Sequence, residues 1–374
     1  MKYYLIAGET SGDLHAASLM AAIKELDPKA SFAYFGGDKM KAQGGTLLKH
    51  IDQMAFMGIL PVLLNLRTIQ RNFKECEKSL LTFNPDILIL VDYPGFNLRM
   101  AKFAKQHNIP NAYYISPKIW AWKTKRIKKV KAFVDHIYSI LPFEKQFYQK
   151  HNYEITYVGN PVWDLIREEL KDTTDFKSFT SKNKLENKPI IALLAGSRKH
   201  EIKALLPEME KVKSHFSNYQ FVIAGAPGIK PEFYKGILKS DLTIVYNQTY
   251  KLLRNSQAAI VTSGTATLET ALLNVPQIVV YKMGFGIIIA LFRKQILKTD
   301  FFSLVNLVAE QEVVKELFQL EVNTKNLTNE LNQILNDKDY RLNILNGYMQ
   351  LRDKISTDGA AKTTAKHIFE LIKR

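Results

Sequence analysis

Short apolar runs alternate with amphipathic stretches along the whole chain. This alternation is typical of strands and helices that follow one another around a parallel sheet, whose buried strands are apolar on both faces. Strands are predicted in the first half at 3–7, 31–35, 86–91, 111–115, 136–139 and 156–158, and in the second half at 189–194, 220–224, 242–246, 258–261 and 277–280. The stretches between them, such as 15–26 and 98–106, predict helices, and from Val313 onward the chain is expected to be helical.

A polar stretch at 171–188 separates the two sets of strands; it reads KDTTDFKSFTSKNKLENK and has almost no large aliphatic residues. At 374 residues the chain is also longer than the ~250–300 residues at which a single core stops growing. We therefore expect two doubly wound, Rossmann-like α/β domains, each binding ligands beyond the carboxyl ends of its strands. The expected bounds are 1–170 for the first domain, 171–188 for the linker, 189–340 for the second domain, and 341–374 for C-terminal helices that return to the first.

The composition is that of a globular protein with a strong excess of positive charge. A net charge of +16 favours polyanionic partners, namely nucleic acid, anionic lipid headgroups or phosphorylated substrates. The single cysteine, Cys76, cannot form an intrachain disulfide, and no His/Cys cluster has metal-ligand spacing, so neither a metal nor a cofactor is expected. The longest uncharged apolar run, 283–292, is shorter than the roughly 20 residues of a spanning helix. We expect a cytosolic protein, or one that lies on a membrane without crossing it.

The second half contains a candidate nucleotide site in the stretch AAIVTSGTATLETALLNVPQIVVY. An apolar strand runs into Ser263, Gly264 and Thr265, and the helix that follows offers free backbone N–H groups to an anion. Glu269, one turn further, is placed to accept two ribose hydroxyls. An ordinary capped helix would look similar, since Ser and Thr are good N-caps.

A second glycine turn in the same half, LLAGSRKHEI, favours the nucleotide interpretation. It follows a predicted strand and carries Arg198, whose guanidinium suits a phosphate. Together the two turns indicate a nucleotide-sugar donor site. The chain lacks the G-x-x-x-x-G-K-[ST] motif of ATPases, and its first strand is not followed by the G-x-G-x-x-G of dinucleotide enzymes.

The first half places single carboxylates at predicted strand ends. In ILILVDYPGFNLRMAK a buried strand delivers Asp92 to the ligand-binding edge, where it could act as a general base on a hydroxyl. Alternatively, Asp92 caps the turn or helix that follows it. The first strand leads into AGETSGDLHAA, a turn from which a helix is expected to restart at Leu14; its Glu9 and Asp13 put negative charge where a phosphate would bind.

Two stretches of the first half suggest contact with a membrane. In ISPKIWAWKTKRIKKVKAF, Trp120 and Trp122 are interleaved with basic residues, and FMGILPVLLNLRTI is unusually apolar. A solvated helix face and a piece of core are the simpler interpretations. The expected membrane-contact residues are Met57, Ile59, Leu60, Val62, Leu63, Trp120, Trp122, Lys125, Arg126, Lys128 and Lys129.

Several motifs resemble, in order and over nearly the whole chain, those of the lipid-A-disaccharide synthases of Gram-negative bacteria. They are AGETSGD, VDYPGFN, YISPKIWAWK, LPFEKQFY, GNP, LAGSRKHEI, SGTATLE and KTDFFSLVNLVA. The chain departs from the family pattern at Gly95, where a second Asp is common, and keeps Asp92. The resemblance implies a GT-B type fold, with two Rossmann-like domains, a cleft between them, and a C-terminal segment returning to the first.

The same resemblance implies an inverting transfer from UDP-2,3-diacylglucosamine to 2,3-diacylglucosamine 1-phosphate. The product would be the β-1,6-linked disaccharide 1-phosphate of lipid A biosynthesis, with release of UDP and without a metal. The first domain would then bind the acceptor and contact the membrane, and the second would bind the UDP-sugar. The family acts peripherally at the membrane, which implies a cytoplasmic protein on the cytoplasmic face of the inner membrane, and it leaves monomer and homodimer both open.

The resemblance also assigns roles to residues. Asp92 is the candidate base, grouped with Glu9 and Asp13, which would face sugar hydroxyls or hold the loop that carries Asp92. Ser11, Gly12 and His15 of the opening turn would line the acceptor site, with His15 reaching the acceptor's phosphate. The UDP-binding and catalytic set comprises Arg198, Ser263, Gly264, Thr265, Glu269 and Asn306.

Two alternatives remain at this point. A UDP-N-acetylglucosamine 2-epimerase, or another GT-B enzyme with a soluble acceptor, would account for the donor turns but not for the apolar stretch at 56–69. A nucleic-acid-binding protein would account for the charge and for Trp120 and Trp122, but would leave Asp92, Glu269 and the glycine turns without a role. Nucleic acid is therefore not an expected partner.

Overall fold

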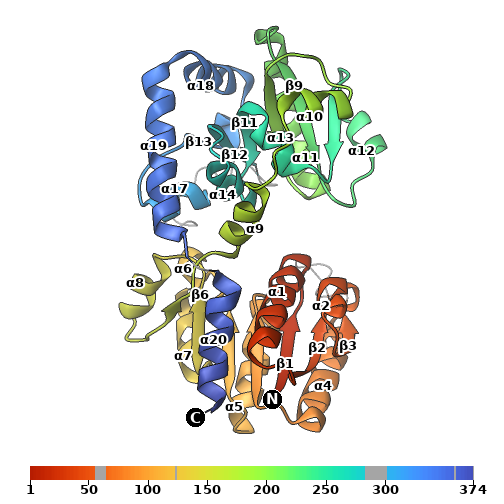
Figure 1. Ribbon diagram of the computed structural model, residues 1–374, viewed down its shortest axis with the longest axis vertical. Coiled ribbons are helices and arrows are strands. Elements are labelled where there is room, and N and C mark those ends of the chain that lie inside the picture. Colours follow the sequence, from red (N-terminus) through yellow and green to blue (C-terminus); the bar gives the residue numbers. More distant parts are fainter. Residues whose placement is uncertain (55–64, 123, 283–300, 358, 374) are drawn as a thin grey trace. The chain divides into compact units, whose positions relative to one another are not determined.

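The chain folds into two compact units. The computed structural model describes residues 1–54, 65–122, 124–282, 301–357 and 359–373. Unit 1 consists of Met1–Pro161 with Thr357–Arg374, and unit 2 of Val162–Ser356. Each contains one sheet with helices packed around it (Figure 1). The predicted α/β class with two doubly wound domains is confirmed.

The sheet of unit 1 has seven parallel strands in the order β3-β2-β1-β4-β5-β6-β7. Its strands are β1 Lys2–Ala7, β2 Ser31–Gly36, β3 Thr46–His50, β4 Ile87–Val91, β5 Asn111–Tyr114, β6 His136–Ser139 and β7 Thr156–Tyr157. Its helices are α1 Thr10–Leu26, α2 Asp38–Ala42, α4 Leu66–Phe83, α5 Pro94–Gln106, α6 Ile119–Trp122, α7 Ile127–Phe133, α8 Glu144–Gln149 and α20 Ala360–Lys373, with 3₁₀ turns at Ile51–Gln53 and Thr124–Arg126.

The two faces of this sheet are covered by different helices. Alternate residues of a strand point to opposite faces, and in β1 Tyr3 and Leu5 belong to one core cluster while Tyr4 and Ile6 belong to the other. The first cluster includes residues of α1 and α20, and the second includes residues of α4, α5 and α7. Because both faces are buried, the strand reads as an unbroken apolar run.

Helix α20 returns from unit 2 to unit 1, as the fold prediction expected. It packs along α1, and its buried face includes Ala361, Ala365 and Ile368. The preceding helix, α19 Lys338–Ile355, belongs to unit 2, so only the last helix of the expected 341–374 segment makes this return.

The sheet of unit 2 has six parallel strands in the order β10-β9-β8-β11-β12-β13. Its strands are β8 Ile190–Leu194, β9 Gln220–Gly225, β10 Thr243–Tyr246, β11 Ser256–Thr262, β12 Gln277–Tyr281 and β13 Glu316–Phe318. Its helices are α9 Pro161–Glu169, α10 Phe176–Lys182, α11 Lys199–Val212, α12 Pro231–Lys235, α13 Thr249–Arg254, α14 Thr265–Leu272, α17 Leu304–Ala309, α18 Thr324–Asn336 and α19, with 3₁₀ turns at Lys213–His215 and Gln319–Glu321.

Two expectations about the chain's organisation need correction. The unit boundary falls at Pro161, before α9, and the polar stretch 171–188 belongs to unit 2 and contains α10. Asp175 caps α10 and Phe179 is buried, so one aromatic side chain anchors a stretch that its composition suggests is a linker. The chain beyond Val313 is not wholly helical either, because β13 pairs with β12.

Candidate active site

In unit 1, the strands β1 and β4 lie side by side where the strand order reverses. Ligands of doubly wound sheets bind beyond the carboxyl ends of the strands at such a point. The last paired residues are Ala7 and Val91, so the turn that begins at Gly8 and the turn that begins at Asp92 leave the same edge. The structure therefore brings together the two segments that the sequence singled out in this half.

Asp92 is held in an unusual backbone conformation. Its φ is 46° and that of Tyr93 is 47°, in the left-handed region that side chains other than glycine rarely adopt. The carbonyl oxygen of Asp92 accepts hydrogen bonds from Asn97 Nδ2 at 2.8 Å and from the hydroxyl of Tyr113. Backbone strain held by buried side chains is typical of functional sites, and here it fixes the direction in which the carboxylate leaves the strand.

The environment of Asp92 favours a base. Burial raises the pKa of its carboxyl group, and this rise is opposed by the positive charge of Lys118 and by a backbone hydrogen bond at Tyr93. A carboxylate with a raised pKa holds a proton more strongly than an ordinary Asp, which is a property that a general base needs. Asp92 is thus equipped to take a proton from a hydroxyl group.

The opening turn is a strand-to-helix junction packed against Tyr93. Helix α1 begins at Thr10 with Glu9 as its N-cap residue, four positions earlier than the expected restart at Leu14. A Cβ at Gly8 would lie 2.3 Å from Cδ1 of Tyr93, so only glycine fits beneath this ring. Burial, and then the negative charge of Glu9, raise the pKa of the Tyr93 hydroxyl, which places Glu9 near the same ring.

Asp13 has a positioning role. Its buried carboxylate accepts backbone hydrogen bonds from Gly37 at 2.8 Å, Lys39 at 2.9 Å and Met40 at 3.1 Å. Asp13 therefore holds the turn after β2 and the start of α2. Three of its roughly four acceptor positions are thus used on a loop other than the one that carries Asp92.

The other residues of this turn differ in exposure. Ser11 is exposed, while Gly12 is buried against Ala7 at an ordinary contact distance. His15 is half-buried, and desolvation lowers its pKa to about 4. Its imidazole is consequently neutral at pH 7, so it could meet a phosphate as a hydrogen-bond donor and not as a cation.

A buried carboxylate that the sequence analysis gave no role lies in the loops after β5 and β6. Glu144 of the LPFEKQFY motif accepts hydrogen bonds from Ser116 Oγ at 2.9 Å and Trp120 Nε1 at 3.0 Å, and from Ser139 Oγ. Ile115, at the end of β5, has a φ of 64°, a strained value for a β-branched residue. Glu144 thus fixes the loop next to Asp92, and only its place in a quoted motif hinted at this.

This network corrects the membrane expectation for Trp120. The Trp120 side chain is 8% exposed, donates to Glu144, and meets the ring of Phe143 edge-on at 4.9 Å. It is a core residue of unit 1, because its indole N–H has a buried acceptor. The side chain of Trp122, and Met57, Ile59, Leu60, Val62 and Leu63, lie outside the described part of the chain.

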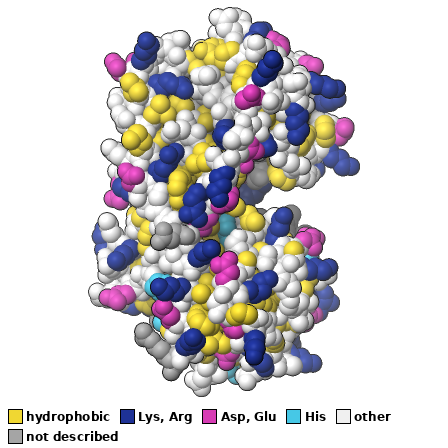
Figure 2. Space-filling model, viewed as in Figure 1, with side chains coloured by type: hydrophobic (Ala, Val, Ile, Leu, Met, Phe, Trp, Pro, Cys, Tyr) yellow, Lys and Arg dark blue, Asp and Glu magenta, His cyan; other side chains and the backbone are white. Residues whose placement is uncertain are grey.

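The basic residues of this segment are at the surface. Lys125, Lys128 and Lys129 are exposed and Arg126 is half-buried. Over the visible face of the molecule, Lys and Arg side chains are spread among Asp and Glu rather than gathered in one stripe (Figure 2). Among the described residues, no helix is both long and apolar enough to cross a membrane.

In unit 2, both glycine turns leave the sheet at its switch point. β8 and β11 are neighbours, with Leu194 paired to Val261, and each turn follows the carboxyl end of one of these strands. Arg198 and Ser263, far apart in the sequence, thus belong to adjacent loops. The predicted donor residues are brought to one edge.

The turn at Ser263 is fixed by hydrogen bonds and leads into the start of a helix. Ser263 donates its backbone N–H to Val280 at 2.9 Å and its hydroxyl to the carbonyl of Phe302 at 3.1 Å, which fixes the turn. No described atom lies within 4 Å of where a Cβ of Gly264 would be, so the space beside this residue is open. Thr265 then begins α14, whose first N–H groups carry the partial positive charge of the helix.

The turn at Arg198 is stabilised by Glu201. The carboxylate of Glu201 accepts the backbone N–H groups of Ser197 at 3.1 Å and Arg198 at 3.2 Å, and it also pairs with the guanidinium of Arg198 at 3.2 Å. Gly196 has a φ of 109° and lies too close to Glu201 for any Cβ. The guanidinium of Arg198 is 56% exposed, so it can be reached by a ligand phosphate.

Glu269 lies on α14, beyond this turn. Burial raises its pKa, and a hydrogen bond from the hydroxyl of Tyr250 to Oε1 at 3.1 Å lowers it. In the described part of the chain, Oε2 of Glu269 has no hydrogen-bond partner. The carboxylate retains the acceptor capacity that two ribose hydroxyls require.

Asn306 differs from the other predicted donor residues. It is fully buried; Nδ2 donates to Val314 O at 2.9 Å and Glu316 Oε1 at 3.0 Å, and Oδ1 accepts from Val313 N and Val314 N. These four bonds use the full capacity of an amide. The structure therefore gives Asn306 a positioning role between α17 and β13, and not the ligand contact that the motif suggested.

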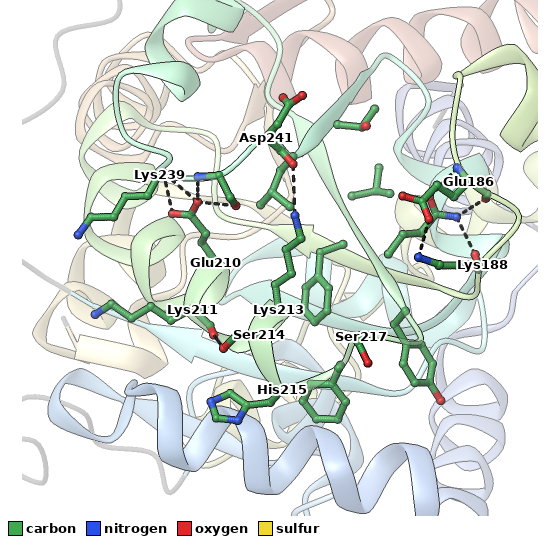
Figure 3. A pocket seen from close by; sticks show the side chains of 18 of the residues that line it. Glu186, Lys188, Glu210, Lys211, Lys213, Ser214, His215, Ser217, Lys239 and Asp241 are labelled. Atoms are coloured by element: carbon green, nitrogen blue, oxygen red, sulfur yellow. Dashed lines mark hydrogen bonds and ion pairs between the residues drawn. The ribbon is translucent and has the colours of Figure 1, made fainter.

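A hollow of about 960 Å³ in unit 2 lies away from this edge (Figure 3). It is lined by residues that precede β8, β9 and β10, among them Lys188, Lys213 and Lys239, so it lies at the amino ends of the strands. Two of its acidic side chains are occupied: Glu210 accepts from the backbone of Lys239, and Glu186 pairs with Lys188. The hollow is separate from the glycine turns, and we do not assign the donor to it.

Comparisons with known proteins agree with this arrangement. The family model described as lipid-A-disaccharide synthetase matches residues 3–366. Lipid-A-disaccharide synthases from Coxiella burnetii (strain CbuG_Q212) and Syntrophus aciditrophicus are 35% and 36% identical to this chain. The alignments cover 98% of this chain and 98% of the first relative, and 99% of this chain and 97% of the second.

Solved structures with the same fold bind UDP or UDP-sugars. A UDP-GlcNAc 2-epimerase from Neisseria meningitidis, bound to UDP-GlcNAc, has a TM-score of 0.69 at 15% identity, with all of both chains covered. A UDP co-structure of MnaA from S. aureus has a TM-score of 0.71 at 12% identity and covers 100% of this chain and 97% of that one. At such identities the likeness shows the GT-B fold alone, whereas the sequence matches show the family. The chain belongs to the lipid-A-disaccharide synthase family.

Proposed function

We propose that this glycosyltransferase joins UDP-2,3-diacylglucosamine to 2,3-diacylglucosamine 1-phosphate and releases UDP. The product is the β-1,6-linked disaccharide 1-phosphate of lipid A biosynthesis. The observation that carries the proposal is that, in a chain of this family, a strained carboxylate and two glycine turns lie at the strand-order reversals of the two sheets. The epimerases share the fold at 15% identity or less, which gives their reaction no comparable support.

Asp92 is the proposed general base. The acceptor's 6-hydroxyl is too weak an acid to attack unaided, so its proton passes to Asp92 as the oxygen bonds to the anomeric carbon of the donor. The bond from that carbon to the UDP oxygen breaks in the same displacement, which inverts the configuration. The buried environment that raises the pKa of Asp92 strengthens it as a proton acceptor.

The two glycine turns of unit 2 are proposed to hold the UDP. Arg198 and the backbone N–H groups at Ser263–Gly264–Thr265 stabilise the negative charge that develops on the departing diphosphate. Glu269 accepts the ribose hydroxyls. Because these donors are fixed before the reaction, they gain strength as charge moves onto UDP.

On the acceptor side, Glu9, Ser11, Gly12 and His15 are proposed to line the sugar site around Asp92. They share the turn after β1 or the first turns of α1. Asp13 and Glu144 act indirectly, through the loops that they hold.

Both proposed substrates carry acyl chains, so the proposed enzyme works at the cytoplasmic face of the inner membrane. Lys125, Arg126, Lys128 and Lys129 supply the contact with anionic lipid headgroups. Trp120 has no part in this contact, because it is buried.

Incubation of the purified protein with both lipid-sugar substrates tests the proposed reaction. Mass spectrometry should detect the disaccharide 1-phosphate, and the UDP released should match it mole for mole. Omission of the acceptor should abolish both signals. Conversion of UDP-GlcNAc to its 2-epimer, without disaccharide formation, would contradict the proposal in favour of the epimerase alternative.

A further inference from the structure

Tyr250 provides the one hydrogen bond that the described residues make to the side chain of Glu269. Tyr250 lies on α13 and Glu269 on α14, and these two helices pack against each other at the carboxyl edge of unit 2. We infer that Tyr250 is a positioning residue, whose hydroxyl orients the Glu269 carboxylate to accept the ribose hydroxyls of the UDP-sugar. The inference rests on the proposed function, in which Glu269 binds that ribose.

A carboxylate that binds a cis-diol needs a fixed plane. Its two oxygens must face two hydroxyls at once, while the terminal torsion of a Glu side chain is broad. The hydroxyl of Tyr250 donates to Oε1 at 3.1 Å, which uses one of about four acceptor positions and leaves Oε2 without a partner among the described residues. This bond selects one orientation before the ligand arrives, and so reduces the entropy lost on binding.

The hydroxyl of Tyr250 is itself well fixed. On the same helix, Lys251 forms an ion pair with Asp172 at 2.8 Å, and Arg254 donates to the carbonyl of Glu169 at 3.2 Å. These contacts tie α13 to the end of α9 and to the chain just after it, and so hold the helix that carries Tyr250. Burial and the charges of Glu269 and Glu169 raise the pKa of Tyr250, which keeps its hydroxyl protonated and donating at neutral pH.

Calorimetry with two nucleotides tests the role of Tyr250. Tyr250→Phe keeps the ring and removes only the hydroxyl. We expect its Kd for UDP to rise roughly three- to tenfold, the worth of one hydrogen bond, and its Kd for 2′,3′-dideoxy-UDP to stay within about twofold of the wild type. If Tyr250 acts only through the packing of its ring, the variant should leave both Kd values unchanged. If the substitution disturbs unit 2 in general, both Kd values should rise by the same factor. Either result overturns the inference.

Tyr246→Phe is the matched control. Tyr246 lies on β10 of the same unit, and its buried hydroxyl has no hydrogen-bond partner among the described residues. Loss of this hydroxyl should therefore change neither Kd.

The proposed function would fail by different results. Wild-type protein that binds UDP no more tightly than the dideoxy analogue would contradict the ribose role of Glu269. Wild-type protein that forms no disaccharide would contradict the proposed reaction itself.

Discussion

At the scale of single residues, the proposed chemistry depends on how one carboxylate is held. Asp92 follows a fully buried strand, and two hydrogen bonds to its carbonyl hold its left-handed backbone. We expect Asp92→Asn to lower kcat by at least about a hundredfold, because the amide cannot accept the proton. Turnover is measured as UDP release with both lipid substrates, and a variant that keeps wild-type kcat would remove Asp92 from the mechanism.

The stability of the same variant separates catalysis from folding. Burial raises the pKa of Asp92, so the folded protein disfavours the charged form of this carboxyl group. The neutral amide removes this cost, and Tm at pH 7 should be unchanged or higher. A Tm well below that of the wild type would attribute the lost activity to unfolding.

Lys118 should set the acid limit of activity. Its positive charge lowers the pKa of Asp92, in opposition to burial. In Lys118→Met this pKa rises, the base is protonated at a higher pH, and the acid limb of kcat/KM against pH shifts upward. Lys74→Met, which removes an exposed lysine from α4, is the control. Identical acid limbs in both variants would show that Lys118 does not act on the base.

Gly8 should tolerate no side chain. A Cβ there meets the ring of Tyr93, whose hydroxyl is bonded to the carbonyl of Met54. Gly8→Ala should therefore cost about 1–3 kcal/mol of unfolding free energy in urea, as overpacking does. At Gly95, in α5, a Cβ meets nothing within 4 Å, and Gly95→Ala should be neutral or stabilising. Equal stabilities for the two variants would argue against the steric reason.

The positions of the single site residues show how much of the site can be predicted from the sequence. Residue type and position after a strand placed Asp92, Arg198 and Ser263 at ligand-binding edges, since parallel sheets expose those edges. The same signals could not tell that Asp13 bonds to backbone N–H groups, or that Asn306 bonds to backbone groups and to the Glu316 side chain. Those partners come from loops brought near by folding, so no local pattern reveals them.

At the scale of elements, strands with an apolar run were predictable, and the edge strands β3 and β13 were not. Only one residue of β3 is buried and β13 has three residues, so neither gives a long apolar run. The start of α1 was misplaced because its first turn contains Ser11 and Gly12, which favour turns. At these points the local composition favours a turn or loop, while packing against the rest of the unit stabilises a strand or a helix.

Helix α20 is part of the core of unit 1 despite its place at the end of the chain. Ile368 is fully buried in the cluster that contains α1 and β1. Ile368→Ala should cost about 2–5 kcal/mol and increase hydrogen exchange in α1 and β1, while β8 and β11 of unit 2 keep their protection. Lys366→Ala, at an exposed position of the same helix, should change neither. Exchange that rises equally in both units would contradict the assignment of α20 to unit 1.

At the scale of the whole molecule, the net charge of +16 has two explanations. It could act as a diffuse field, since basic residues are spread over the visible surface (Figure 2). It could also act locally, through Lys125, Arg126, Lys128 and Lys129. Net charge alone cannot separate the two, because both predict salt-sensitive binding to anionic lipid.

Two variants with the same change in net charge distinguish these explanations. Reversal of Lys125, Arg126, Lys128 and Lys129 to Glu should weaken co-sedimentation with phosphatidylglycerol-containing vesicles by roughly a thousandfold, since each basic residue near an anionic surface contributes about 1 kcal/mol. The matched variant reverses four exposed lysines of unit 2, Lys203, Lys230, Lys235 and Lys239. It should bind vesicles nearly as the wild type does, because those lysines belong to the other unit. Equal losses of vesicle binding in both variants would mean that binding depends on the overall charge, and not on the four basic residues at 125–129.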